Sequence, residues 1–101
     1  MPKLTKPTKV NVGGIEYKIW FERDFGDNLF GRTVSTDQEI LINKDVSEER
    51  QRVTLLHEML HAISNEMVDI ELSEQQVNSV SLELYRILKN DKRIRDFLLP
   101  S

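Results

Sequence analysis

The chain of 101 residues contains no cysteine and only two histidines, and it has a small excess of negative charge. Without cysteine there is neither a disulfide framework nor a thiolate metal site, so any bound metal must be held by histidine and carboxylate side chains. The net charge of −3 argues against a nucleic-acid partner, which needs a basic face. No apolar run approaches the length of a membrane span, and none follows the N-terminal lysines as a secretory signal would require. We therefore expect a cytoplasmic protein with no membrane association.

The remaining composition is that of an ordinary globular domain, with 39% hydrophobic and 31% charged residues. A chain of this length holds one domain with a modest core. Residues 1–8 contain two prolines and should form an extended N-terminal arm, followed by a single domain over residues 9–101.

The two histidines stand in one motif, H-E-x-x-H, formed by His57, Glu58 and His61. Four residues of an α-helix correspond to about 400° of rotation and about 6 Å of rise. Both imidazoles then leave the same face of the helix, one turn apart, where they can share a Zn²⁺ ion. Glu58 lies about 100° from His57, at the border of this face, where it suits a general base acting on a zinc-bound water. The competing interpretation is a core helix with two buried, hydrogen-bonded histidines.

Apolar residues around the motif recur at helical spacing, which predicts a helix that packs on a core: Val53, Leu56, Leu60 and Ile63. We expect this helix to begin near Ser47 and to end between Asn65 and Met67. Asn43, Asp45 and Ser47 are the candidates for its N-cap, and Asp45 followed by Glu48 resembles a capping box.

Two β-hairpins should precede this helix. Alternating runs on either side of Gly13-Gly14, from Val10 to Ile19, indicate the first hairpin. Strands over Phe30–Ser35 and Glu39–Ile42 form the second. The sequence therefore predicts an α+β fold with a small antiparallel or mixed sheet.

A second packing helix should begin near Ser73 and bury one apolar face, made of Val77, Val80, Leu84, Ile87 and Leu88. A short helical turn from Ile94 to Leu99 should then close the core.

A catalytic zinc usually takes a third protein ligand, which must here be acidic. Glu66 lies about 180° from His57 and points away. Glu74 lies on the inward stripe of the second helix, and antiparallel packing of the two helices would bring it near His61. Asp69 and Glu71, in the connecting segment, are the alternatives. A further interpretation of Glu74 is a charge that complements the helix dipole.

The order of these elements resembles a minimal gluzincin. The run from Thr54 to Ile63 is similar to small metallopeptidase-like proteins of phages and mobile elements, distant relatives of the ImmA/IrrE-type family. This resemblance implies a zincin-like half-domain and a zinc metallopeptidase, with His57, His61 and Glu74 as zinc ligands and Glu58 as the base. It also implies a peptide or protein substrate along the edge of the strand Glu39–Ile42.

A non-catalytic zinc-binding regulatory or interaction module of a phage or mobile element is the alternative function. Gluzincins normally also use a side chain that stabilises the oxyanion. Tyr85 lies about 16 Å beyond Glu74 along its helix and is expected in the core. Tyr17 lies on a strand, and Arg32 is expected to be solvated, so no candidate stands out.

Overall fold

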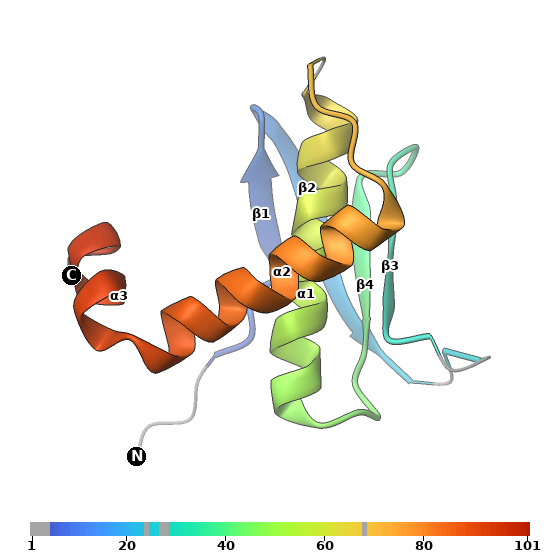
Figure 1. The fold of residues 1–101 in the computed structure, drawn as a ribbon. Coiled ribbons are helices and arrows are strands. Elements are labelled where there is room, and N and C mark those ends of the chain that lie inside the picture. Colours follow the sequence, from blue (N-terminus) through green and yellow to red (C-terminus); the bar gives the residue numbers. More distant parts are fainter. Residues whose placement is uncertain (1–4, 24, 27–28, 68) are drawn as a thin grey trace.

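The computed structural model describes residues 5–23, 25–26, 29–67 and 69–101, which form an α+β fold as expected. The elements, in chain order (Figure 1), are β1 (Lys9–Val12), β2 (Ile15–Glu22), β3 (Gly31–Val34), β4 (Glu39–Asn43), α1 (Glu48–Glu66), α2 (Glu74–Asn90) and α3 (Lys92–Leu98). Residues 1–4 of the expected arm lie outside the described residues. The rest of the arm runs beside the sheet, where the carbonyl of Thr8 accepts a hydrogen bond from the amide of Ile19 at 2.8 Å.

The four strands form one mixed sheet in the order β1-β2-β4-β3. Both expected hairpins are present and antiparallel, and they are joined by parallel pairing of β2 with β4. The strand expected to offer a free edge, Glu39–Ile42, is therefore an interior strand with partners on both sides. Ile40 and Ile42 belong to the core, and Leu41, on the opposite face of the strand, is also buried. The free edge on this side of the sheet belongs to β3.

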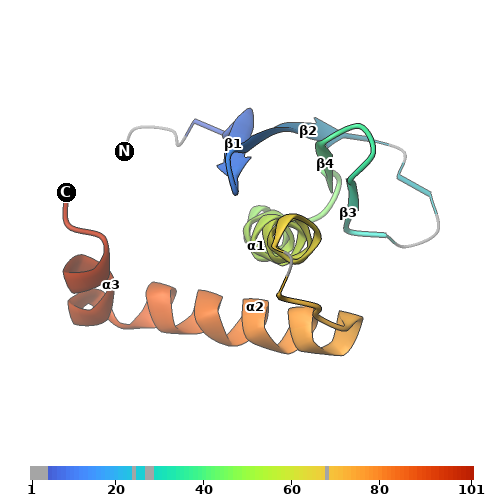
Figure 2. The ribbon, with the colours of Figure 1, turned by 90° about the horizontal axis from the view of Figure 1, so that it is seen from above.

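The molecule has three layers, with the sheet on one side, α1 in the middle and α2 outermost (Figure 2). The core between the sheet and α1 contains apolar side chains from β1, β2, β4 and α1: Val12, Tyr17, Ile19, Ile40, Ile42 and Ala62. The two long helices do not pack antiparallel, because α2 crosses α1 steeply (Figures 1 and 2). Helix α2 still contacts α1 through both of its own ends, with Glu74 beside His61 and Lys89 paired with Glu49.

Helix α1 turns polar residues of the motif region towards the sheet. Its buried residues are Gln51, Thr54, Glu58 and Ala62. Gln51 donates hydrogen bonds to two carbonyls of the preceding loop, at 2.9 and 3.3 Å. Of the three N-cap candidates the structure selects Ser47, whose hydroxyl accepts a hydrogen bond from the amide of Arg50, so Asp45 does not form the capping box with Glu48.

The C-terminal elements contribute less to the core than the sequence suggests. Val77 is fully buried, but Val80, Leu84 and Ile87 are exposed, and α3 buries none of its residues. The expectation that the last helical turn closes the core is therefore wrong. Within the described part of the chain, none of the helices combines the length and hydrophobicity needed to cross a bilayer.

Candidate metal centre

The two histidines of α1 point their rings at the same place. The Nε2 atoms of His57 and His61 lie 3.2 Å apart, and the ring centroids are 4.9 Å apart at an interplanar angle of 67°. Both imidazoles are partly shielded, with 16% and 26% of the side-chain surface exposed. They are therefore accessible from one side, unlike histidines enclosed in a core.

Glu74, in the first turn of α2, brings its carboxylate to both rings. Its Oε1 lies 2.9 Å from Nε2 of His57, and its Oε2 lies 2.8 Å from Nε2 of His61. The carboxylate is otherwise open to solvent, with 71% of the side chain exposed. The ligand atoms of the three residues all lie within 4.8 Å of one another.

Local hydrogen bonds fix the start of α2 beside α1. Ser64 of α1 donates to the carbonyl of Ile70 at 3.2 Å and accepts from the amide of Leu72 at 3.1 Å. Ser73 then forms a reciprocal capping box with Gln76. The connecting segment is thus tied to α1 immediately before Glu74, although the two helices cross steeply.

The donor set fits a metal ion of the zinc type. Two imidazole nitrogens bound to a tetrahedral zinc at about 2.05 Å would lie about 3.3 Å apart, close to the separation of His57 and His61. Protonated at Nε2, both rings can donate hydrogen bonds to Glu74; deprotonated there, the rings and the carboxylate can surround one cation. The cluster of His57, His61 and Glu74 can therefore hold a metal ion.

Glu58 is buried between α1 and the sheet, with 7% of its side chain exposed. The hydroxyl of Thr33, on β3, donates a hydrogen bond to Glu58 Oε1 at 2.8 Å and is also 3.0 Å from the Glu58 carbonyl. The other carboxylate oxygen, Oε2, lies 4.0 Å from Nε2 of His57. Burial raises the pKa of the Glu58 carboxyl above its ordinary value, while the Thr33 hydrogen bond and the imidazoles act in the opposite direction.

Gly31 allows β3 to approach α1 this closely. A Cβ at this position would lie 2.6 Å from Cγ2 of Thr54 and 2.9 Å from the Leu41 carbonyl oxygen. Any larger residue would push β3 away from the helix, and Thr33, two residues further along the strand, would move with it. The absence of a side chain at Gly31 thus supports the contact between Thr33 and Glu58.

These groups lie on one open cavity of about 410 Å³. It is lined by Leu29, Gly31, Arg32, Thr33, His57, Glu58, His61, Asn65 and Glu74. Sequence reasoning missed Thr33, Gly31 and Asn65. The signal for Asn65 was present, because it continues the four-residue spacing of the two histidines; Thr33 gave no local signal, because its contact with Glu58 spans 25 residues.

The other residues considered from the sequence lie elsewhere. Glu66 accepts a hydrogen bond from the Tyr17 hydroxyl at 2.7 Å, and burial of Tyr17 together with this hydrogen bond raises the pKa of Tyr17 to about 12. Among the described residues, the group that could hold a metal includes neither Asp69 nor Glu71. Tyr85 is only partly buried and lines a different cavity.

Arg32 borders the cavity, but its side chain belongs to the outer face of the sheet. It pairs in register with Leu41, whose neighbours Ile40 and Ile42 face the core, and its guanidinium lies over the ring of Phe25 at 5.3 Å. Its charge is thus directed away from α1.

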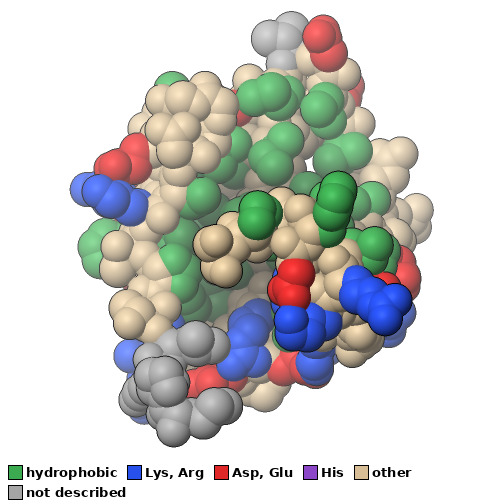
Figure 3. Space-filling model, turned by 90° about the vertical axis from the view of Figure 1, so that its left-hand side faces the viewer, with side chains coloured by type: hydrophobic (Ala, Val, Ile, Leu, Met, Phe, Trp, Pro, Cys, Tyr) green, Lys and Arg blue, Asp and Glu red, His purple; other side chains and the backbone are tan. Residues whose placement is uncertain are grey.

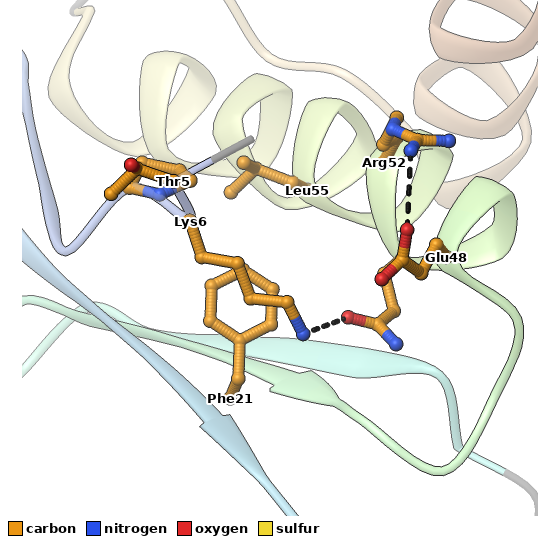
Figure 4. A pocket seen from close by; sticks show the side chains of 8 residues that line it. Thr5, Lys6, Phe21, Glu48, Arg52 and Leu55 are labelled. Carbon is orange, nitrogen blue, oxygen red and sulfur yellow. Dashed lines mark hydrogen bonds and ion pairs between the residues drawn. The ribbon is translucent and has the colours of Figure 1, made fainter. Parts of the chain in front are cut away.

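A second cavity, of about 270 Å³, lies between the N-terminal arm, β2 and the start of α1 (Figure 4). Lys6 extends over the ring of Phe21 at 4.6 Å and donates a hydrogen bond to Gln51 at 2.9 Å. Arg52 pairs with Glu48 at the far wall, as Figure 4 shows. These polar groups already have partners within the chain, so this cavity is a packing feature of the arm.

Comparison with known protein families gives one result. Residues 21–91 match a peptidase family described as the IrrE N-terminal-like domain. The match covers more than half of the chain and includes both histidines, Glu58 and Glu74. No curated protein and no solved structure matches the chain.

Proposed function

The chain belongs to the peptidase family of the IrrE N-terminal-like domain, and on this basis we propose that it is a zinc-dependent peptidase. The observation that carries the proposal is the position of Glu58. A buried carboxylate held by Thr33 beside the cluster of His57, His61 and Glu74 serves no purpose in a purely structural metal site. The same arrangement is what hydrolysis by an activated water requires.

His57, His61 and Glu74 would hold the zinc ion, leaving the side towards the open cavity for water and substrate. In such a site zinc supplies Lewis-acid chemistry, lowering the pKa of water towards about 7 and polarising a carbonyl group. The exposure of Glu74 suits this role, because the cluster is closed on the α1 side and accessible on the other.

Glu58 would act as the general base. Its Oε1 is occupied by the Thr33 hydroxyl, so its Oε2, which faces His57, is the oxygen free to accept a proton from the attacking water. The same oxygen can then return the proton to the leaving amine. Burial favours this exchange, because a raised pKa makes Glu58 a stronger base than an exposed carboxylate.

The substrate would be an extended peptide bound along the free edge of β3. The amide of Asn43 donates to the Phe30 carbonyl at 2.8 Å, so Phe30 is directed at β4. Antiparallel pairing alternates, and the backbone groups of Gly31 and Thr33 therefore point to the open edge. Both residues line the cavity of Glu58, so a strand added there would pass the proposed zinc site.

A non-catalytic zinc-binding module of a phage or mobile element is the second candidate. It is favoured by one observation: among the described residues that line the cavity, the only cationic side chain is Arg32, which lies over Phe25. Without a cationic side chain directed at the cluster, a peptidase reaction would have to stabilise its oxyanion with an uncharged donor, such as the side-chain amide of Asn65.

The test uses zinc-loaded protein, a library of unstructured peptides, and mass spectrometry to detect cleavage. Glu58→Gln should retain zinc and lose activity by about 10²-fold or more, because general-base catalysis typically contributes that much. Glu66→Gln is the matched control, since Glu66 lies on the same helix but binds Tyr17. Equal cleavage by wild type and Glu58→Gln would contradict the mechanism. Stoichiometric zinc without any cleavage by the wild type would favour the non-catalytic module.

A further inference from the structure

From Val80 onward, α2, α3 and the residue that follows α3 carry an apolar surface that the fold leaves uncovered. It contains seven of the eleven exposed large hydrophobic side chains among the described residues: Val80, Leu84, Ile87, Ile94, Phe97, Leu98 and Leu99. We call this set the α2–α3 surface. Phe97 is the extreme case, with 85% of its surface exposed.

Because the helices cross steeply, α2 has only a narrow buried face (Figure 2). It buries Val77 and Ser81, and Lys89 in its last turn pairs with Glu49 in the first turn of α1. Helix α3 packs on the end of α2. Val80, Leu84 and Ile87 nevertheless recur at the spacing of an apolar helix stripe, which is normally buried against another element.

The α2–α3 surface is larger than a monomer normally exposes. From the exposed fractions of its seven residues it covers about 700 Å², against about 300–600 Å² for the largest apolar patch of a typical monomer. One partner of a standard protein interface contributes about 800 Å². The surface is therefore of the size that one side of a stable pair provides.

The charged side chains around this surface do not favour an anionic partner. Three of the five cations of α2 and α3 pair with carboxylates of the chain, namely Arg86 with Glu83, Lys92 with Asp96, and Lys89 with Glu49, and Arg93 is exposed. Arg95 donates to the carbonyls of Leu88 and Lys89. Two such surfaces can approach each other without strong like-charge repulsion, and there is no large positive field to attract a lipid headgroup or a nucleic acid.

The shape provides both halves of a contact. Figure 3 views the end of the molecule that carries α3 and shows hydrophobic side chains gathered around a hollow between the helices and the sheet. One copy thus has a projecting apolar helix and an apolar recess beside it. A two-fold axis would seat each in the other, as an isologous interface requires.

We propose that the α2–α3 surface is the interface of a two-fold symmetric dimer of this chain. The pair would bury about 1,400 Å² in total, within the range of about 1,200–2,000 Å² for specific complexes. The surface begins at Val80, six residues after Glu74, and its other members lie further along α2 and α3, so the dimer leaves the cluster with His57 and His61 accessible. The proposal does not depend on catalysis.

The test is sedimentation analysis of the wild type over a range of concentrations, with Leu84→Glu and Phe97→Glu as variants. Each glutamate would place a charge in an apolar contact, so each should weaken association by at least about tenfold. Ile70→Glu is the matched control, because Ile70 is comparably exposed, at 41%, but lies outside the surface. Circular dichroism checks that the variants fold.

A wild-type dimer that both variants dissociate, while Ile70→Glu remains dimeric, is the expected result. Amide exchange over residues 80–99 should then slow as the concentration of the wild type rises. A wild type that stays monomeric would overturn the proposal. A dimer that persists in both variants, or an assembly that grows beyond two copies, would overturn it as well.

Discussion

Replacing Thr33 by valine tests how the buried carboxylate of Glu58 is maintained. Valine keeps the size and β-branching of threonine and removes only the hydroxyl that donates to Glu58 Oε1 at 2.8 Å. Hydrogen bonds to charged groups contribute about 1.5–3 kcal/mol, and Glu58, with 7% of its side chain exposed, has little water to replace the lost donor. Thr33→Val should therefore lower the free energy of unfolding by about 1.5–3 kcal/mol in metal-free protein near neutral pH.

The assay is urea unfolding of wild type, Thr33→Val and Thr33→Ser, with Thr36→Val at an exposed turn position as the control. Serine restores the hydroxyl and should recover most of the loss. The Thr33 hydrogen bond lowers the pKa of Glu58, so its contribution is present when Glu58 is ionised and decreases as the pH falls through that pKa. The reasoning is refuted if Thr33→Val is as stable as the wild type, or if serine is no better than valine.

Three further substitutions have defined outcomes. Metal-free Glu58→Gln should be more stable than the wild type at neutral pH, because burial raises the pKa of Glu58; thermal melts should show the difference disappearing below about pH 4. Gly31→Ala should lower the free energy of unfolding in urea by about 1–3 kcal/mol, because its Cβ would meet Thr54 at 2.6 Å. Tyr17→Phe should lower the free energy of unfolding by about 1–3 kcal/mol, because Glu66 loses its hydrogen-bond donor. In the wild type the pKa of Tyr17 is raised to about 12, so the stabilisation that its hydroxyl provides should be lost as the pH rises from about 10 to about 12. Unchanged unfolding curves would contradict each expectation.

Local patterns were sufficient to predict the secondary structure. The alternation around Gly13-Gly14 and the helical spacing around the histidines depend only on near neighbours, and both elements lie where expected. The strand order depends on pairing between distant segments, which hairpin signals do not encode. The run of Ile40, Leu41 and Ile42 did carry the missing information, because three buried apolar residues in succession indicate an interior strand.

In the candidate site, too, the residues related by local spacing could be predicted, and those that depend on contacts between distant segments could not. His57, Glu58 and His61 follow from one helix turn, and Glu74 followed from an inward acidic position, although the antiparallel packing assumed for it is absent. Thr33 and Gly31 act through contacts between β3 and α1, so no spacing within the sequence could reveal them.

The apolar stripe of α2 was misjudged because helical periodicity shows which residues seek a partner, but not whether the same chain supplies it. Val77 is fully buried, whereas Val80, Leu84 and Ile87 are exposed. The steep crossing of the two helices leaves α2 only a narrow buried face.

The most direct test of the central claim is the metal content of gently purified protein after zinc is offered. The account predicts about one zinc per chain in the wild type and in Glu71→Ala, whose residue lies outside the cluster. His61→Ala and Glu74→Ala should each bind zinc at least about tenfold more weakly, because each removes one of three protein ligands. A wild type without zinc would contradict the account. Glu74→Ala binding zinc as tightly as the wild type would contradict the proposed set of ligands.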